Sequence, residues 1–191
     1  MMDSSTQMTN DQRLALITDM INKARFNFSR GSFYFILWGV LLFASAIYEY
    51  IADRLMDIPM PWIGWPIVGI VGGVLSALYS RRMYSDQPTT HLDRVYSAIW
   101  TVYFLTLVML VIAWVSQRIN PGSYILIVTG FPTFLTGYIL KFKPLQWGGV
   151  IFWSLGLLSL FFLDEYRSLI FALAMIIGYV VPGLMMRNIK S

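Results

Sequence analysis

Glu49 is the residue whose type and position point most directly to chemistry. It lies in a stretch from Ser32 to Ala52 that is otherwise free of charge. A carboxylate inside a membrane is costly unless it is paired, protonated or hydrated, so such a residue is a functional candidate. Glu49 could bind a cationic solute or accept a proton in coupled transport. Alternatively, it reaches headgroup water near the end of its stretch or pairs with a nearby base, for which the candidates are Arg54, Arg118 and Arg167.

Acidic and aromatic residues accompany Glu49 in the segments expected on its side. A vestibule of acids and aromatic rings suits a cation, through charge and through cation–π attraction. The same residues suit ordinary loop solvation and aromatic anchoring equally well. Two tryptophans inside apolar stretches extend the candidate set. Besides Glu49, the candidate ligand-binding residues are Trp38, Tyr50, Asp53, Trp153 and Asp164.

The chain shows no signature of an enzyme or of a metal centre. It has no cysteine, and His91 is its single histidine, which is too little for a typical zinc or iron site. The motifs G-x-S-x-G, G-x-x-x-x-G-K and H-E-x-x-H are absent. We therefore expect no catalytic residue, no metal ligand and no cofactor.

The composition indicates a lipid environment. The chain is 57% hydrophobic and 13% charged, whereas soluble domains average roughly 45–50% and about 25%. Apolar stretches of roughly 20 residues match the hydrocarbon thickness of a bilayer. We predict an all-α polytopic membrane protein with six spans. They are 33–52, 62–80, 95–116, 122–140, 145–163 and 168–186.

The distribution of positive charge predicts the orientation of these spans. With the amino terminus inside, eleven Lys and Arg residues lie on the inner side and three on the outer side. The outer three are Arg54, Arg118 and Arg167. This bias places both termini in the cytoplasm. The net charge of +4 sits in short loops and not on one soluble face, so we expect no nucleic-acid partner.

Residues 1–30 form a separate region before the transmembrane domain, 31–191. We predict a disordered tail and then a helix with one apolar stripe, formed by Leu14, Ile17, Ile21, Ala24 and Phe28. One interpretation is an interfacial helix that lies in the headgroup layer. The other is a docking helix for a partner or a second protomer, because the spacing fits two heptads.

Small residues and an internal pattern suggest how the spans pack. Gly69, Gly73 and Ala77 form a small-xxx-small ridge, which lets helix backbones approach closely in lipid. Alignment of the three hairpins on Trp38, Trp100 and Trp153 suggests three parallel repeats. Their second spans then carry the central glycines Gly72, Gly130 and Gly178. Kinks are expected at Pro132 and Pro182.

The opening of the chain resembles a family of small, multi-span bacterial inner-membrane proteins of uncharacterised function. The resemblance rests on the run from Met20 to Phe28, on Phe33-Tyr34-Phe35 and on Trp38-Gly39. It implies a bacterial inner-membrane location and no activity. In length and span number alone, the chain is also similar to the substrate-binding subunits of energy-coupling-factor vitamin importers.

Two functions follow as alternatives. The first is a non-enzymatic membrane subunit or interaction partner in an assembly, either a homo-oligomer or a complex with another membrane protein. The second is binding or transport of a small, cationic solute through Glu49 and the outer vestibule. The lipid bilayer is a partner in both.

Overall fold

The computed structural model describes residues 10–56, 58–84, 91–117 and 121–188, with residues 10–30, 83, 84, 91–93, 117 and 164 described by their backbone alone. These residues form helices and connecting turns, with no strand among them. Six helical segments are long and apolar enough to cross a membrane, which confirms the predicted number of spans. Their bounds are Gly31–Arg54, Pro61–Arg82, Arg94–Ser116, Gly122–Ile139, Lys143–Phe161 and Arg167–Asn188.

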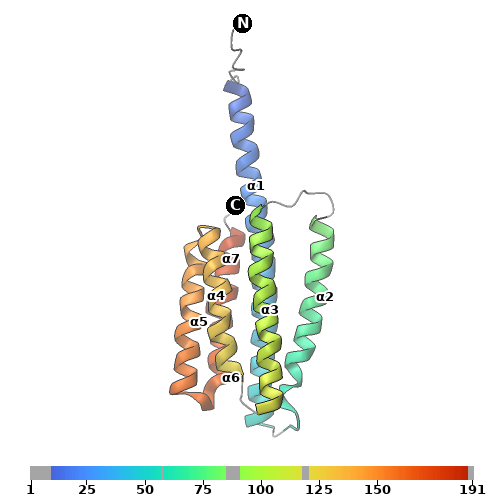
Figure 1. Ribbon diagram of the computed structural model, residues 1–191, viewed down its shortest axis with the longest axis vertical. Helices are drawn as coiled ribbons and strands as arrows, with labels where there is room; N and C mark the ends of the chain where they lie inside the picture. The colour runs from blue at the N-terminus through green and yellow to red at the C-terminus, as the bar shows by residue number, and fades with distance from the viewer. Residues whose placement is uncertain (1–9, 57, 85–90, 118–120, 189–191) are drawn as a thin grey trace.

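The first helix, α1, runs without a break from Asn10 to Arg54. The lead-in helix and the first span, which the sequence analysis treats as two elements, are therefore one helix. Its 45 residues correspond to a length of about 68 Å. The amino-terminal part projects beyond the bundle, from the end at which the carboxyl terminus also lies (Figure 1). The predicted disordered tail before Thr9 falls outside the described residues.

The next helices return along the bundle and complete it. A 3₁₀ turn, Pro61–Ile63, leads into α2, Gly64–Tyr84, and α3 is His91–Gln117. Helices α4, Gly122–Ile139, and α5, Lys143–Phe161, form a hairpin. A second 3₁₀ turn, Asp164–Tyr166, then leads into the last span.

The last span is not a uniform α-helix. Helix α6, Arg167–Met175, passes into a π-helical segment, Ile176–Val180, and then into α7, Val181–Asn188. Pro182 is the second residue of α7, two positions after this segment, and it cannot donate the backbone hydrogen bond that a regular helix needs at its position. The irregularity expected at Pro182 is thus a π-helical turn. Pro132, by contrast, lies inside the continuous α4.

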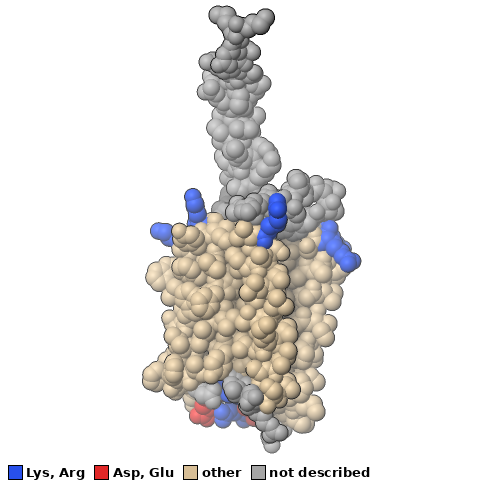
Figure 2. All heavy atoms as spheres, in the orientation of Figure 1, with Lys and Arg blue, Asp and Glu red and all other residues tan. Residues whose placement is uncertain are grey.

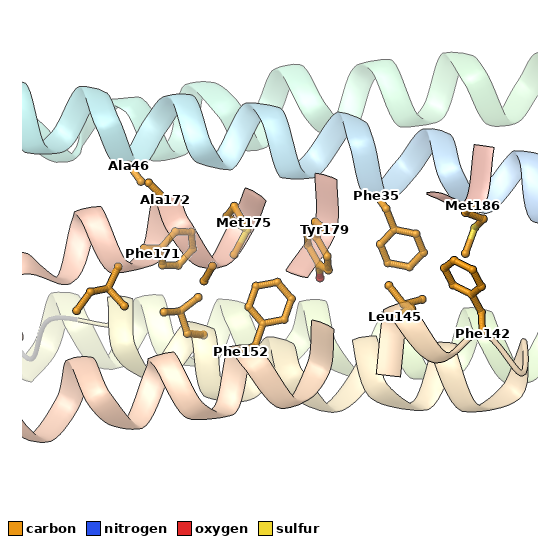
Figure 3. Packing of buried hydrophobic residues seen from close by; sticks show 13 residues of the cluster. Phe35, Ala46, Phe142, Leu145, Phe152, Phe171, Ala172, Met175, Tyr179 and Met186 are labelled. Carbon is orange, nitrogen blue, oxygen red and sulfur yellow. The ribbon is translucent and has the colours of Figure 1, made fainter. Parts of the chain in front are cut away.

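The core lies between α1, the α4–α5 hairpin and the last span. Phe35, Phe152, Phe171, Met175 and Tyr179 are among its buried side chains (Figure 3). Only 6% of the residues in the spans of α2 and α3 are buried, compared with 44% in α4 and 56% in the last span. Helices α2 and α3 are therefore peripheral, and most of their apolar side chains face outward.

Glycine allows α4 and α5 to lie in close contact. A methyl group on Gly149 would come within 2.8 Å of the carbonyl oxygen of Gly130 and of the amide nitrogen of Phe134. A methyl group on Gly137 would come within 2.6 Å of the amide nitrogen of Gln146. Near the far end of the hairpin, the buried Ser123 and Ser159 hydroxyls are hydrogen-bonded at 2.9 Å. Close backbone approach of this kind stabilises helix pairs in lipid.

We expect Gly149→Ala to destabilise the protein, because the added methyl group meets backbone atoms that cannot rotate away. Overpacking of this kind costs about 1–3 kcal/mol. Gly73→Ala is the matched control, since it adds the same group to a helix interior with no atom within 4 Å. It should leave stability unchanged or raise it by up to about 1 kcal/mol through helix propensity. Thermal unfolding in detergent measures both changes, and equal effects would contradict the glycine contact.

Candidate functional site

Glu49 joins three helices at one end of the bundle. Its Oε2 atom accepts a hydrogen bond from Nε1 of Trp65, at 3.1 Å, and another from Oγ of Ser168, at 3.2 Å. Trp65 is near the start of α2, and Ser168 is near the start of α6. The Trp65 ring also packs edge-on against Phe171, with 4.9 Å between ring centroids. The half-buried carboxylate thus fastens α1 to both neighbouring helices.

The sequence suggested Arg54, Arg118 and Arg167 as partners of Glu49, and the structure gives Arg54 another partner. Arg54 donates to Oε1 of Glu165 at 3.2 Å and to the Glu165 carbonyl oxygen at 3.3 Å. Its Nε atom lies 3.5 Å from Oδ2 of Asp53. Arg167 is close enough to interact with Glu49 through its charge. Arg118 lies outside the described residues.

One oxygen of Glu49 remains open. Among the described residues, none donates a hydrogen bond to Oε1. A cation that approached from this end of the bundle could bind the other carboxylate oxygen, Oε1. The Oε2 atom is already held by the indole of Trp65 and the hydroxyl of Ser168. The arrangement can therefore hold a cationic group, and it also serves as a plain structural link.

The remaining candidate residues do not all gather at Glu49. Tyr50 is half-buried and Asp53 is exposed, both on α1 near the same end. Asp164 lies in the turn before α6, and its side chain is outside the description. Trp38 and Trp153 lie at the middle of the bundle, on different helices. The predicted candidates therefore divide into residues near one end of the bundle (Glu49, Tyr50, Asp53 and Asp164) and two tryptophans that lie away from them.

The two central tryptophans pack against glycines. Nε1 of Trp38 donates to Oγ of Ser76 at 3.2 Å, and its ring lies over Gly72 of its own hairpin. Trp153 of the third aligned unit lies over Gly130, which belongs to the second unit. Its Nε1 is buried without a hydrogen-bond partner among the described residues. The contacts of the aligned positions therefore differ from one hairpin to another. The packing gives no support to the threefold repeat.

The predicted ridge on α2 faces away from the bundle. Gly69, Gly73 and Ala77 are exposed, and a methyl group on either glycine would meet no atom within 4 Å. Gly72, beside them, instead touches Trp38. Any helix that packs on Gly69, Gly73 and Ala77 is thus not part of the described chain.

A line of buried hydroxyls along α4 escaped the sequence analysis. The Tyr103 and Thr129 hydroxyls are 2.8 Å apart, and the Thr133 and Tyr179 hydroxyls are 3.3 Å apart. Thr129 and Thr133 also bond to the carbonyl oxygens of Ile125 and Thr129, one turn earlier. The network links α3, α4 and the π-helical segment. The spacing of Thr129, Thr133 and Thr136, beside Pro132, was the available signal.

Comparisons with known proteins give no relative. No family model, curated protein or solved structure matches this chain. No group of three His, Asp or Glu side chains suited to a metal occurs in the described parts of the chain. The expectation that the protein has no metal, cofactor or enzymatic activity stays a prediction.

We expect the Glu49 link to depend on its oxygen and not on its charge. Glu49→Gln keeps an oxygen that accepts from Trp65 and Ser168, so stability should change little. Glu49→Leu has nearly the same size but leaves both donors unpaired, which costs about 1–3 kcal/mol. Thermal unfolding of the two variants in detergent measures the difference. A Gln variant as unstable as the Leu variant would show that charge dominates.

Proposed function

We propose that this protein is a multi-pass inner-membrane protein of bacteria that acts by binding, as a membrane subunit or interaction partner in an assembly. Both termini are cytoplasmic. The supporting arrangement is a belt without Lys, Arg, Asp or Glu on the visible face, with charged side chains gathered at the two ends (Figure 2). Within the six spans that the sequence analysis predicts, Glu49 is the one charged residue.

The positive charge favours one orientation. Arg81, Arg82, Arg94, Lys141, Lys143 and Arg187 lie at the helix ends on the side where both termini are found. The opposite end has Arg54 and Arg167 together with Asp53 and Glu165. The positive-inside rule assigns the first side to the cytoplasm.

Labelling of introduced cysteines tests this orientation cleanly, because the natural chain has no cysteine. In intact cells, we expect a membrane-impermeant maleimide to label Met56→Cys, in the loop between α1 and α2. Lys141→Cys, in the turn between α4 and α5, should react only after the cells are lysed. Labelling in the reverse order would overturn the proposed orientation.

The observation that carries the assembly role is the outward ridge on α2. Gly69 and Gly73 present bare backbone to the surroundings, with open space where a side chain would be. Small residues in lipid stabilise a helix most when a second helix packs on them. No helix in the described part of the chain packs on Gly69 and Gly73. The projecting part of α1 adds a second surface, clear of the bundle (Figure 1). An unbroken helix that leaves the membrane favours docking over an interfacial position.

Solute binding is the second candidate, and the open Oε1 atom of Glu49 supports it. Its carboxylate is oriented by Trp65 and Ser168, and Asp53 and Tyr50 lie near on α1. A cationic solute that entered from the outer end would pass the exposed Asp53 and then reach the half-buried Glu49. This role would make the protein a transporter or its binding subunit.

Native mass spectrometry of protein extracted with its own lipids separates the two roles. For the assembly role, we expect a defined homo-oligomer or a co-extracted protein. The double variant Gly69→Ile and Gly73→Ile should reduce this species at least tenfold, because bulky side chains keep the helices apart. Ala113→Ile adds bulk to an exposed site on α3, and it should leave the species unchanged.

The result that contradicts the assembly role is equally specific. A complex that survives the double variant unchanged would remove α2 as the contact. A small-molecule adduct that is present in the natural protein and absent from Glu49→Gln would instead establish the solute-binding role.

A further inference from the structure

A surface groove between α4 and α5 opens at the end of the bundle that carries the basic residues. Its volume is about 330 Å³, and it is lined by Phe134, Lys143, Gln146, Trp147 and Val150. Phe134 comes from α4, and the other four residues come from the first part of α5. Lys143 and Val150 are seven positions apart, so the groove extends about 10 Å along the helix axis.

The groove is basic at one end and apolar along its length. Lys143 is exposed and forms no ion pair with any residue in the described part of the chain. It is also the first residue of α5, where the helix dipole adds positive potential. Phe134, Trp147 and Val150 supply apolar and aromatic surface along the groove. An occupant should therefore have a negative group next to an apolar chain.

Two observations narrow the class of ligand. No carboxylate lines the groove, so the ammonium of a zwitterionic headgroup would find no counter-charge there. A free phosphate would satisfy Lys143 and leave the apolar surface of Phe134 and Val150 uncovered. Trp147, which is 65% exposed, lies next to the basic end. There, its amphipathic ring suits the boundary between headgroups and acyl chains.

We propose that this groove binds one phospholipid with a net negative headgroup. The phosphate lies at Lys143, and the upper part of one acyl chain lies along Phe134 and Val150. The proposal rests on the orientation given above, because it needs the groove to open in the cytoplasmic leaflet. It is independent of the assembly role, since α4 and α5 lie apart from the ridge on α2.

Gln146 fixes the shape of the groove. Its side-chain nitrogen donates to the carbonyl oxygen of Gly137 at 3.1 Å, across the turn between the helices. This bond holds the side chain against α4 and away from the open space. The groove is thus part of the hairpin's own structure, supported by the same glycine contacts that bring the two helices together.

The turn offers a matched control for Lys143. Lys141 is also exposed, has the same charge and lies two residues away, but it does not line the groove. Its φ angle of 52° is in the left-handed region, which asparagine tolerates well. Lys141→Asn and Lys143→Gln therefore remove equal charge from the same end of the protein, and only the second change alters the groove.

The test is titration of the detergent-purified full chain, followed by native mass spectrometry. The ligands are phosphatidylglycerol, phosphatidylcholine with the same acyl chains, and glycerol 3-phosphate as the headgroup chemistry alone. We expect one preferred phosphatidylglycerol adduct. We also expect its affinity to fall roughly tenfold in Lys143→Gln, since one charge-assisted contact is lost. Lys141→Asn should stay within about twofold of the natural protein, given the screening of exposed charges.

A second variant tests the apolar part without changing charge. Val150→Phe fills the groove and should weaken the phosphatidylglycerol adduct while Lys143 remains. Equal binding of phosphatidylcholine, equal losses in the two lysine variants, or binding of glycerol 3-phosphate as tight as that of the lipid would each overturn the proposal. An intact oligomer with no lipid adduct would overturn this site alone and leave the assembly role standing.

Discussion

The close backbone contact between α4 and α5 is the constraint on which the rest of this bundle depends. In lipid, apolar side chains gain little from burial against each other, so tight packing and hydrogen bonds must hold the helices together. Gly130 and Gly149 provide that packing at the centre of the hairpin. Around this pair, Phe152 and Leu145 fill the space towards α1 and the last span (Figure 3). The peripheral helices α2 and α3 then attach through a few large rings.

Those rings explain how two loosely packed helices keep their places. Trp38 reaches from α1 to Gly72 and Ser76 on α2, and it also contacts Phe104 on α3. Trp62, in the 3₁₀ turn before α2, meets Trp114 near the end of α3 edge-on, with ring centroids 6.1 Å apart. Long aromatic side chains bridge gaps that backbones do not close, so the inner face of each helix is fixed. Its outer face stays available to lipid or to another protein.

The number and approximate bounds of the spans could be predicted from sequence, because apolar runs of bilayer length carry that information directly. The contacts among the spans could not. The bond between Trp65 and Glu49 joins two helices whose relative rotation no local pattern fixes. Likewise, the ridge at Gly69 and the hairpin at Gly149 look alike as glycine-rich sequence. Only the three-dimensional arrangement turns one outward and the other inward.

The continuity of α1 has a mechanical consequence. A helix of 45 residues without a proline behaves as one stiff lever, since its backbone hydrogen bonds resist bending at any single residue. A sideways force on the projecting end is therefore carried into the bundle. There, Gly39 of α1 lies so close to Tyr179 and Val180 of the π-helical segment that a side chain at this position would collide with them. At the opposite end, the same helix carries the Glu49 link to α2 and α6, so one continuous helix joins the projecting segment to the contacts on the other side of the bundle.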